Sequence, residues 1–233
     1  MIVGIMGKAG SGKDTLGLYL QELFASEYKL SFYVTCFAKK LKELCVKQFN
    51  LNTEQLWGND KEKPIIGLCK PQGVNGVLGR EHKGISSNSN DYWSPREIMQ
   101  EVGELYRRID YNFWIKQLEN DIKDTTNVVI TDVRNASEVT YVKTGSIFSL
   151  TNCSENTSAY AVSGVIVKIN RDNRKKIRNT EHVSETGLDE FIDYDIFVDN
   201  NGTLKDLRTA AHDVVDMIIK LNNLNSKGGI EYV

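Results

Sequence analysis

The first fifteen residues, MIVGIMGKAGSGKDT, constrain the fold of this chain more than any other stretch. An apolar run from Met1 to Met6 leads into a glycine-rich turn, and an amphipathic helical pattern begins at Lys13. Gly7, Gly12 and Lys13 have the G-x-x-x-x-G-K spacing of a phosphate-binding loop. In such a loop backbone N–H groups and a helix N-terminus face phosphate oxygens, and the lysine reaches the outer phosphates. The stretch predicts nucleotide binding, against the alternative of a glycine-rich turn that binds nothing.

The residue after Lys13 indicates which class of nucleotide-binding protein to expect. It is Asp14, and the hydroxyl comes one place later, at Thr15. The hydroxyl that commonly contacts Mg²⁺ directly after the lysine is therefore displaced or replaced. A G-K-x-T ending is common in small-metabolite kinases, whereas GTPases and motor ATPases keep Ser or Thr next to the lysine. The ending favours a kinase.

Length and composition exclude several other classes. A chain of 233 residues suits one α/β domain over residues 1–233 with an inserted segment. The formal net charge of −2 and the pI near 6.0 argue against a general nucleic-acid or membrane-surface binder. The four cysteines are scattered without a C-x-x-C pair, so we expect free thiols in a reducing compartment. With no signal-peptide pattern and no membrane-spanning run, we expect a cytoplasmic protein.

The next segments predict a strand and a helix that carries a candidate phosphate ligand. Residues Leu30 to Phe37 are rich in β-branched and aromatic residues, as in a buried strand. Residues Ala38 to Phe49 show apolar positions at helical spacing with lysines between them. These lysines form an ordinary solvated face or, near the carboxyl end of the strand, reach a ligand crevice. Lys42 is the candidate for the second role.

A long irregular segment separates this helix from the next. From Gly58 to Trp93 glycine, serine and asparagine are too frequent for a regular element, so an insertion over about 58–93 covers a substrate or is a surface insertion. Order returns at Ser94, where Ser94, Pro95 and Glu97 predict a capped helix start. A second helix is expected near Tyr111 to Ile122. Arg96 in the first helix either binds substrate or makes surface ion pairs.

The segment NVVITDVRNASE has the character of the second half of a nucleotide site. A short apolar strand from Val128 to Thr131 ends at Asp132, which can organise Mg²⁺ or hold a substrate hydroxyl. Arg134 offers a bidentate fork for phosphate, and Glu138, one helical turn later, could orient it. The alternative for Asp132 is a simple helix cap.

The C-terminal third predicts further strands and a cationic loop. Strands are expected at Ser146 to Leu150, Val165 to Arg171 and Tyr194 to Val198, followed by a helix from Leu204 to Leu221. Between the last two strands the sequence concentrates Arg171, Arg174, two lysines and Arg178. This is an ordinary basic loop or a lid, at about 171–182, that closes over transferring phosphates. His182 is expected to be a structural hydrogen bonder.

These motifs together resemble the deoxynucleoside monophosphate kinases of large tailed bacteriophages. The matching segments occur in the same order across most of the chain: GKAGSGKDT, FAKKLKEL, WGNDKE, SPREIMQEVGELYRR, ITDVRNASE and INR…HVSE…NNGTLKDL. The phosphate loop is shared with many kinases, whereas the SPR…MQ..G, D-V-R and H-x-S-E segments are more specific. The Gly/Ser-rich stretch and residues 146–164 depart from the pattern, which leaves base preference open.

The resemblance implies roles for particular residues. ATP phosphates would be bound by Gly10, Ser11, Gly12, Lys13, Asp14 and Thr15. The nucleoside monophosphate would be bound by Lys42, Arg96, Gly103, Trp114, Asp132, Arg134 and Glu138. Lys13, Arg134, Arg171 and Arg174 would stabilise the transferring phosphoryl group, and Asn201–Thr203 would pack against adenine. No dedicated metal site is expected, because Mg²⁺ would be held through ATP and water, with Thr15 or Asp132 as protein contacts.

The expected fold is a P-loop three-layer α/β/α sandwich with a mostly parallel sheet of about five strands and mobile insert and lid segments. The expected reaction is ATP plus dNMP giving ADP plus dNDP, in the cytoplasm, or the host cytoplasm if the chain is phage-encoded. The expected partner is a small nucleotide, with no nucleic acid and no membrane, and a homodimer is left open. Two alternatives remain: a kinase of another phosphorylated metabolite, such as phosphomevalonate or dephospho-coenzyme A, and a nucleotide-dependent switch.

Overall fold

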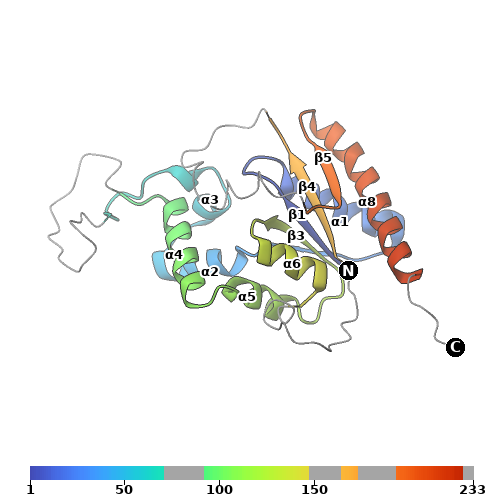
Figure 1. The fold of residues 1–233 in the computed structure, drawn as a ribbon. Coiled ribbons are helices and arrows are strands. Elements are labelled where there is room, and N and C mark those ends of the chain that lie inside the picture. The colour runs from blue at the N-terminus through green and yellow to red at the C-terminus, as the bar shows by residue number, and fades with distance from the viewer. Residues whose placement is uncertain (71–91, 147–163, 173–192, 228–233) are drawn as a thin grey trace. The chain divides into compact units, whose positions relative to one another are not determined.

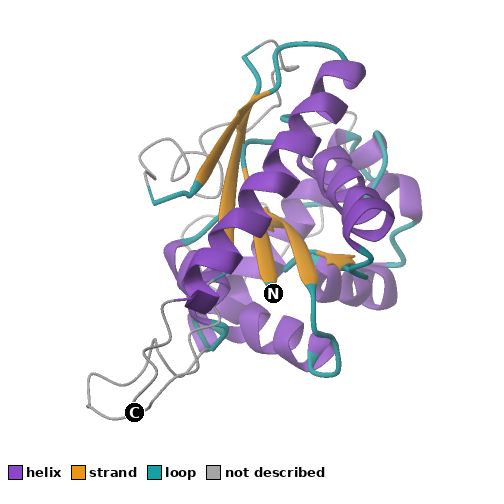
Figure 2. Cartoon of the chain, turned by 90° about the vertical axis from the view of Figure 1, so that its right-hand side faces the viewer, coloured by secondary structure: helices purple, strands orange, loops and turns teal. Residues whose placement is uncertain are grey.

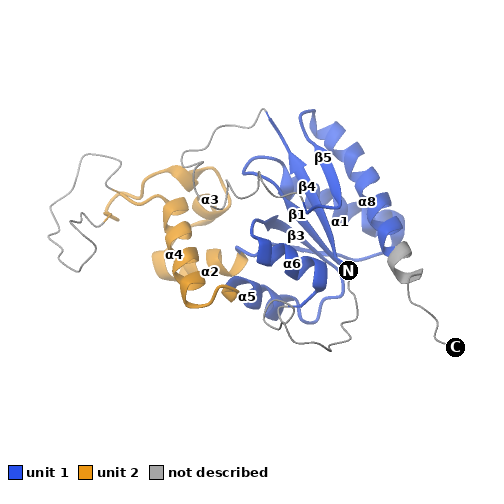
Figure 3. Cartoon of the chain, in the orientation of Figure 1, with its two compact units in different colours: residues 1–38, 114–233 blue, residues 39–113 orange. Residues whose placement is uncertain are grey.

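The computed structural model describes residues 1–70, 92–146, 164–172 and 193–227. Two compact units are present (Figure 3). The first combines Met1–Ala38 with Trp114–Val233, and the second is the continuous segment Lys39–Phe113. The expected strand at 146–150 and most of the expected lid lie outside the described residues.

The first unit contains a five-stranded sheet in the order β2-β3-β1-β4-β5, and every pairing is parallel. The strands are β1 (Ile2–Met6), β2 (Tyr33–Thr35), β3 (Val128–Val133), β4 (Val165–Asn170) and β5 (Ile196–Asp199). Because β1 lies in the centre, the glycine-rich turn that follows it emerges at the carboxyl ends of its neighbours β3 and β4. Ligands of open parallel sheets bind at this edge.

Helices cover both faces of the sheet, which confirms the expected α/β sandwich (Figures 1 and 2). On one face α1 (Lys13–Tyr28) runs alongside α8 (Leu204–Lys227). The other face is covered by α5 (Phe113–Ile122) and α6 (Ala136–Thr144). Each face of the sheet has its own hydrophobic core, and alternate residues of β1 contribute to the two. Val3 and Ile5 pack with α1 and α8, and Met6 packs with α5 and α6. The apolar run at the N-terminus is thus a strand buried on both sides.

The second unit is helical in its described part. Its elements are α2 (Lys39–Phe49), α3 (Thr53–Leu56), the short 3₁₀ helix η1 (Asp60–Glu62) and α4 (Pro95–Ile109). Helices α2 and α4 pack against each other, and a Cβ added at Gly103 would lie 3.3 Å from the side chain of Leu41. Gly103 therefore permits the close approach of the two helices.

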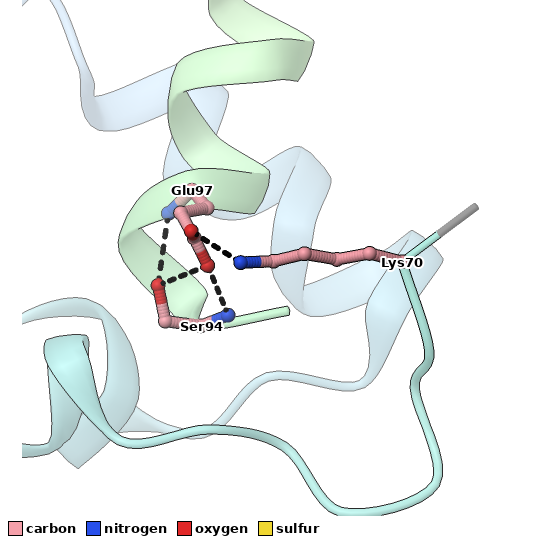
Figure 4. A network of polar contacts seen from close by, with 3 residues as sticks. All are labelled: Lys70, Ser94 and Glu97. Atoms are coloured by element: carbon pink, nitrogen blue, oxygen red, sulfur yellow. Dashed lines mark hydrogen bonds and ion pairs between the residues drawn. The ribbon is translucent and has the colours of Figure 1, made fainter. Parts of the chain in front are cut away.

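Helix α4 begins as the sequence predicts, in a capping box that Lys70 extends (Figure 4). The Ser94 backbone N–H donates to Glu97 at 2.8 Å, and the Glu97 N–H donates to the Ser94 hydroxyl at 3.3 Å. The Lys70 ammonium donates to the other Glu97 oxygen at 2.6 Å. Burial alone would raise the pKa of Glu97, but the hydrogen bonds from Lys70 and Ser94 outweigh it, so this pKa lies below its usual range.

Strand β2 is shorter than the predicted strand at Leu30–Phe37, because only Tyr33–Thr35 pairs with β3. The N–H groups of Phe37 and Ala38 donate to the Asp132 carboxylate instead of continuing the ladder. A side chain from the neighbouring strand therefore ends β2.

Strand β3 is longer than predicted, because it extends to Val133 instead of ending before Asp132. Gly4 pairs with Ile130 and Met6 pairs with Val133, so β3 carries one extra residue between these pairs. Such an irregularity re-aims side chains next to a functional edge.

Other element boundaries also differ from the predictions. Helix α8 continues to Lys227 rather than ending near Leu221, and the helix predicted from Tyr111 begins at Phe113. Helix α3 was not expected at all, and η1 lies inside the segment that was expected to be irregular.

Within the described ranges, no helix is both long and apolar enough to cross a membrane.

Cys36, Cys45 and Cys69 are free thiols, and Cys153 lies outside the described residues. Burial raises the pKa of the Cys45 thiol to about 11, so this buried thiol stays protonated at neutral pH.

Candidate functional site

The phosphate-loop motif folds as a compact turn between β1 and α1. Gly10 and Gly12 adopt positive φ angles of 76° and 99°, a conformation that glycine adopts without strain. The Ser11 N–H donates to the carbonyl of Lys8 at 3.1 Å, which closes the turn. The Lys13 ammonium donates to the same carbonyl at 2.7 Å, and Lys13 is only 7% exposed. The Lys13 side chain therefore folds back along the loop at the start of α1. A phosphate bound there would contact both the lysine ammonium and the N-terminus of the helix.

The carboxylate of Asp14 connects the start of α1 to β3. The Thr131 hydroxyl donates to Asp14 Oδ1 at 2.7 Å, and Thr131 is buried. A Cβ added at Gly17, one turn along α1, would lie 2.6 Å from the Thr131 methyl group. The position after the lysine, where many phosphate loops have a hydroxyl that contacts Mg²⁺, is thus held by a carboxylate that accepts a hydrogen bond from β3.

Asp132, the next residue of β3, faces the end of β2. Its two carboxylate oxygens accept from the Phe37 N–H at 2.6 Å and the Ala38 N–H at 3.0 Å. Each oxygen of an ionised carboxylate has a further acceptor position, so a ligand hydroxyl can still be bound. Asp132 is half-buried, and the two N–H groups that donate to it lie directly before the start of α2.

Arg134 and Glu138 meet at the start of α6, but through the backbone of the arginine. Glu138 is 3% exposed, and its carboxylate accepts from the Arg134 N–H at 2.7 Å and the Asn135 N–H at 3.1 Å. The Asn135 amide also donates to Glu138 at 2.9 Å. Glu138 therefore fixes the turn from which the Arg134 side chain departs.

The predicted acceptor residues of the second unit have defined partners. The Lys42 ammonium lies 5.2 Å from the centre of the Trp57 ring, and Arg96 forms an ion pair with Glu62. Gly103 lies where α4 packs on α2. Trp57, the first residue of the matching segment WGNDKE, has no role assigned from the sequence; it is 47% exposed and follows the four-residue helix α3.

Trp114, the aromatic residue that the sequence singled out, belongs to the first unit and is 4% exposed. Its predicted contact with substrate therefore stays a prediction. Trp57 presents far more ring surface in the described part of the chain.

At the other side of the phosphate loop, β4 and β5 end in a group of polar residues. Arg171 and Asp172 follow β4, and Arg171 is half-buried. The Asn201 amide donates to Asp172 at 2.9 Å and to Asp199 at 2.6 Å, and its oxygen accepts from the Asp172 N–H at 2.7 Å. The turn after β5 is thereby joined to the residues that lead into the predicted lid. Arg174, Arg178 and His182 lie outside the described residues.

No group of three or more His, Cys, Asp or Glu side chains able to hold a metal ion occurs in the part of the chain that the structure describes. The hydroxyl of Thr15 lies in the first turn of α1, and Asp132 has acceptor capacity left. These residues fit an Mg²⁺ ion that is held mainly by nucleotide phosphates and water, as is usual for this ion.

Comparison with known proteins identifies the family. The sequence model of the deoxynucleotide monophosphate kinase family matches residues 74–210. The chain belongs to this family. A protein of Acanthamoeba polyphaga mimivirus that carries the same name provisionally is 24% identical over 241 residues, which cover 95% of this chain and 100% of the relative. The deoxynucleotide monophosphate kinase of Enterobacteria phage T4 is 24% identical over 143 residues, which cover 58% of this chain and 51% of that enzyme.

Membership of a kinase family makes the chain a phosphotransferase. The resemblance drawn from the motifs is confirmed at the level of the family. The matched segment contains Arg96, Asp132, Arg134 and Arg171, and it begins after the phosphate loop.

Proposed function

We propose that this chain transfers the γ-phosphoryl group of ATP to a deoxynucleoside monophosphate, giving ADP and the deoxynucleoside diphosphate. Two observations together support the proposal: residues 7–13, which have the spacing of a phosphate-binding loop, fold as a compact turn before α1, and the family model matches residues 74–210, which do not include this turn. The two observations come from different parts of the chain. Both point to phosphoryl transfer.

The donor side of the proposal is built on the phosphate loop. The backbone of Gly10 to Lys13 would surround the ATP phosphates, and the Lys13 ammonium would exchange the Lys8 carbonyl for phosphate oxygens. We place Asp14 and Thr15 at the same loop, with Asp14 holding α1 against β3 through Thr131. Bound Mg²⁺ would supply charge neutralisation for the phosphates. Positioning and charge stabilisation account for most catalysis in phosphoryl transfer, so little covalent chemistry is required of the protein.

The acceptor side of the proposal follows the residue roles that the resemblance to the family implies. We propose that Lys42, Arg96 and Arg134 bind the acceptor phosphate and that Asp132 accepts a hydrogen bond from the sugar 3′-hydroxyl. Glu138 would act by fixing the Arg134 backbone, since its carboxylate is bonded there. For Arg96 the proposal requires that its ion pair with Glu62 loosen when a phosphate binds. Gly103 would support this side through the packing of α4 on α2.

Aromatic residues are proposed to form the base side of the acceptor site. Trp114 remains in this set, and Trp57 joins it because its half-exposed ring lies beside Lys42. Base–aromatic stacking is tolerant of sequence, which would allow more than one base. Arg171 and Arg174 are proposed to stabilise the transferring group from the segment that follows β4.

The test is an ADP-release assay over deoxynucleoside monophosphates, ribonucleoside monophosphates and phosphorylated metabolites, with chromatographic identification of the product. We expect turnover with several deoxynucleotides and formation of the matching diphosphates. Turnover with phosphomevalonate or dephospho-coenzyme A alone would replace the proposal with the rival kinase. ADP release without an acceptor, and without a diphosphate product, would indicate a nucleotide hydrolase or switch.

A further inference from the structure

Asn200 is the first residue after β5, and its side chain reaches the phosphate loop from the far end of the chain. It is 3% exposed, and its Nδ2 donates to the carbonyl oxygen of Ser11 at 2.8 Å across 189 residues of sequence. Its own backbone N–H donates to the Asn170 carbonyl at 2.8 Å, at the end of β4. The backbone of Asn200 is therefore fixed to β4, and its side chain is fixed to the phosphate loop.

The bond is made to the peptide group that sets the direction of a loop N–H. Because a trans peptide is planar, the Ser11 carbonyl and the Gly12 N–H point in opposite directions. Fixing the carbonyl on Asn200 therefore turns the Gly12 N–H away from Asn200. A Cβ added at Gly12 would lie 2.5 Å from Nδ2, so the amide packs directly against this α-carbon. Ser11 is 0% exposed, so solvent has little access to replace the amide.

We infer that Asn200 is a positioning residue for the donor nucleotide: its amide orients the Ser11–Gly12 peptide so that the Gly12 N–H is presented to the triphosphate. The inference rests on the proposed function, because it assumes that the loop binds a nucleoside triphosphate. It assigns Asn200 to the donor alone. The acceptor phosphate and sugar are assigned to other residues, so their binding should be insensitive to this side chain.

The experiment compares Asn200→Ala, Asn200→Asp and the matched control Asn127→Ala. Asn127 also donates an amide hydrogen to a backbone carbonyl, that of Ser31 at 3.2 Å, but it lies next to the N-terminal end of β3. The dissociation constant of a non-hydrolysable ATP analogue is measured by calorimetry with Mg²⁺, at a temperature at which each variant is folded by circular dichroism. KM for ATP, KM for the acceptor and kcat are measured in parallel.

We expect Asn200→Ala to weaken binding of the analogue about 10-fold or more, as loss of a buried hydrogen bond to a carbonyl left without a partner implies. KM for the acceptor should stay within about twofold, and Asn127→Ala should leave binding of the analogue unchanged. Asn200→Asp keeps the side-chain size, but the ionised carboxylate cannot donate a hydrogen bond. We therefore expect it to weaken binding of the analogue at least as much as Asn200→Ala does. It also keeps the test decisive if the alanine variant does not fold.

Two results would overturn the inference. One is a lower melting temperature of the Asn200 variants with unchanged affinity for the analogue, which would make the bond purely structural. The other is an equal increase of KM for both substrates. If the wild-type protein itself bound no triphosphate analogue, the proposed function would fail, and this outcome is distinct because no variant is needed to see it.

Discussion

At the scale of single residues, Lys13 connects the loop geometry to the proposed chemistry. Its ammonium is held by the Lys8 carbonyl at 2.7 Å, inside the loop that would surround phosphates. We expect Lys13→Ala to remain folded and to lose more than about nine-tenths of kcat, which corresponds to a barrier increase above about 1.4 kcal/mol. Charge stabilisation of a transferring phosphoryl group in a water-excluded site supports a larger loss. Turnover and circular dichroism check both parts.

The matched control for this prediction is Lys29→Ala. Lys29 lies at the other end of α1, is exposed and donates to the Ser26 carbonyl at 3.0 Å. It should retain wild-type turnover. A Lys13→Ala variant that kept more than about a tenth of kcat would show that the loop does not take part in transfer.

Arg134 tests the acceptor side at the same scale. Arg134→Lys preserves charge but loses the bidentate fork that suits phosphate, so we expect KM for the dNMP to rise about tenfold. The Glu138 bonds to the backbone remain available in this variant, because they do not use the guanidinium. Kinetics with varied dNMP at saturating ATP check the prediction, with the exposed Arg108→Lys as control. A rise confined to KM for ATP would move Arg134 to the donor side.

The sequence could indicate these residues only where their signal is local. Lys13 was predictable because strand, loop and helix follow one another within fifteen residues. The bond from Thr131 to Asp14 spans 117 residues, and that from Asn200 to Ser11 spans 189. No local pattern marks such pairs, because the sheet brings them together only when its carboxyl ends align.

At the scale of elements, the start of α4 makes stability depend on pH. Hydrogen bonds from Lys70 and Ser94 hold the pKa of Glu97 below its usual range despite partial burial. A carboxyl whose folded pKa is depressed stabilises the fold above its unfolded pKa, about 4.3, and loses this contribution as pH falls through the folded pKa. Glu97→Gln should therefore weaken hydrogen-exchange protection of α4 at pH 7, and the difference from wild type should shrink below about pH 4.

Hydrogen exchange followed by mass spectrometry measures this difference peptide by peptide, after correction for the intrinsic rate at each pH. Glu101→Gln is the control, since Glu101 is exposed on the same helix. A Glu97→Gln effect of equal size at pH 7 and pH 3 would show that the charge of Glu97 does not stabilise the cap.

The boundaries of elements that begin with local capping residues could be predicted from the sequence. Boundaries that depend on contacts with distant residues could not. Ser94, Pro95 and Glu97 predicted the start of α4 because their hydrogen bonds are local. The end of β2 depends on Asp132, which lies 95 residues after Phe37. Helix α3 has its own capping box from Asn52 to Gln55, but four residues are too few to show a helical period.

At the scale of the whole molecule, the chain is a member of the deoxynucleotide monophosphate kinase family and contains two compact units. The sequence predicted the sandwich because the apolar strands and amphipathic helices alternate along the first unit. The sequence predicted one domain over residues 1–233 with an insertion at about 58–93, and the structure groups residues 39–113 as a second compact unit.

The proposed substrate class implies a preference for deoxyribose over ribose. Asp132 is proposed to hold the 3′-hydroxyl, which both sugars possess, so discrimination must come from the surface that faces C2′. If this surface is apolar, a ribose hydroxyl is buried without a partner at a cost of about 1–3 kcal/mol. This cost corresponds to roughly 5- to 150-fold in kcat/KM.

The most direct measurement is therefore kcat/KM for dGMP against GMP, and for dTMP against UMP, at fixed Mg-ATP. We predict turnover of both deoxynucleotides and a preference for each over its ribonucleotide within roughly 5- to 150-fold. Equal values in both pairs would contradict the deoxynucleotide assignment and leave a general nucleotide kinase. Absence of turnover with all four nucleotides would contradict the proposed function itself.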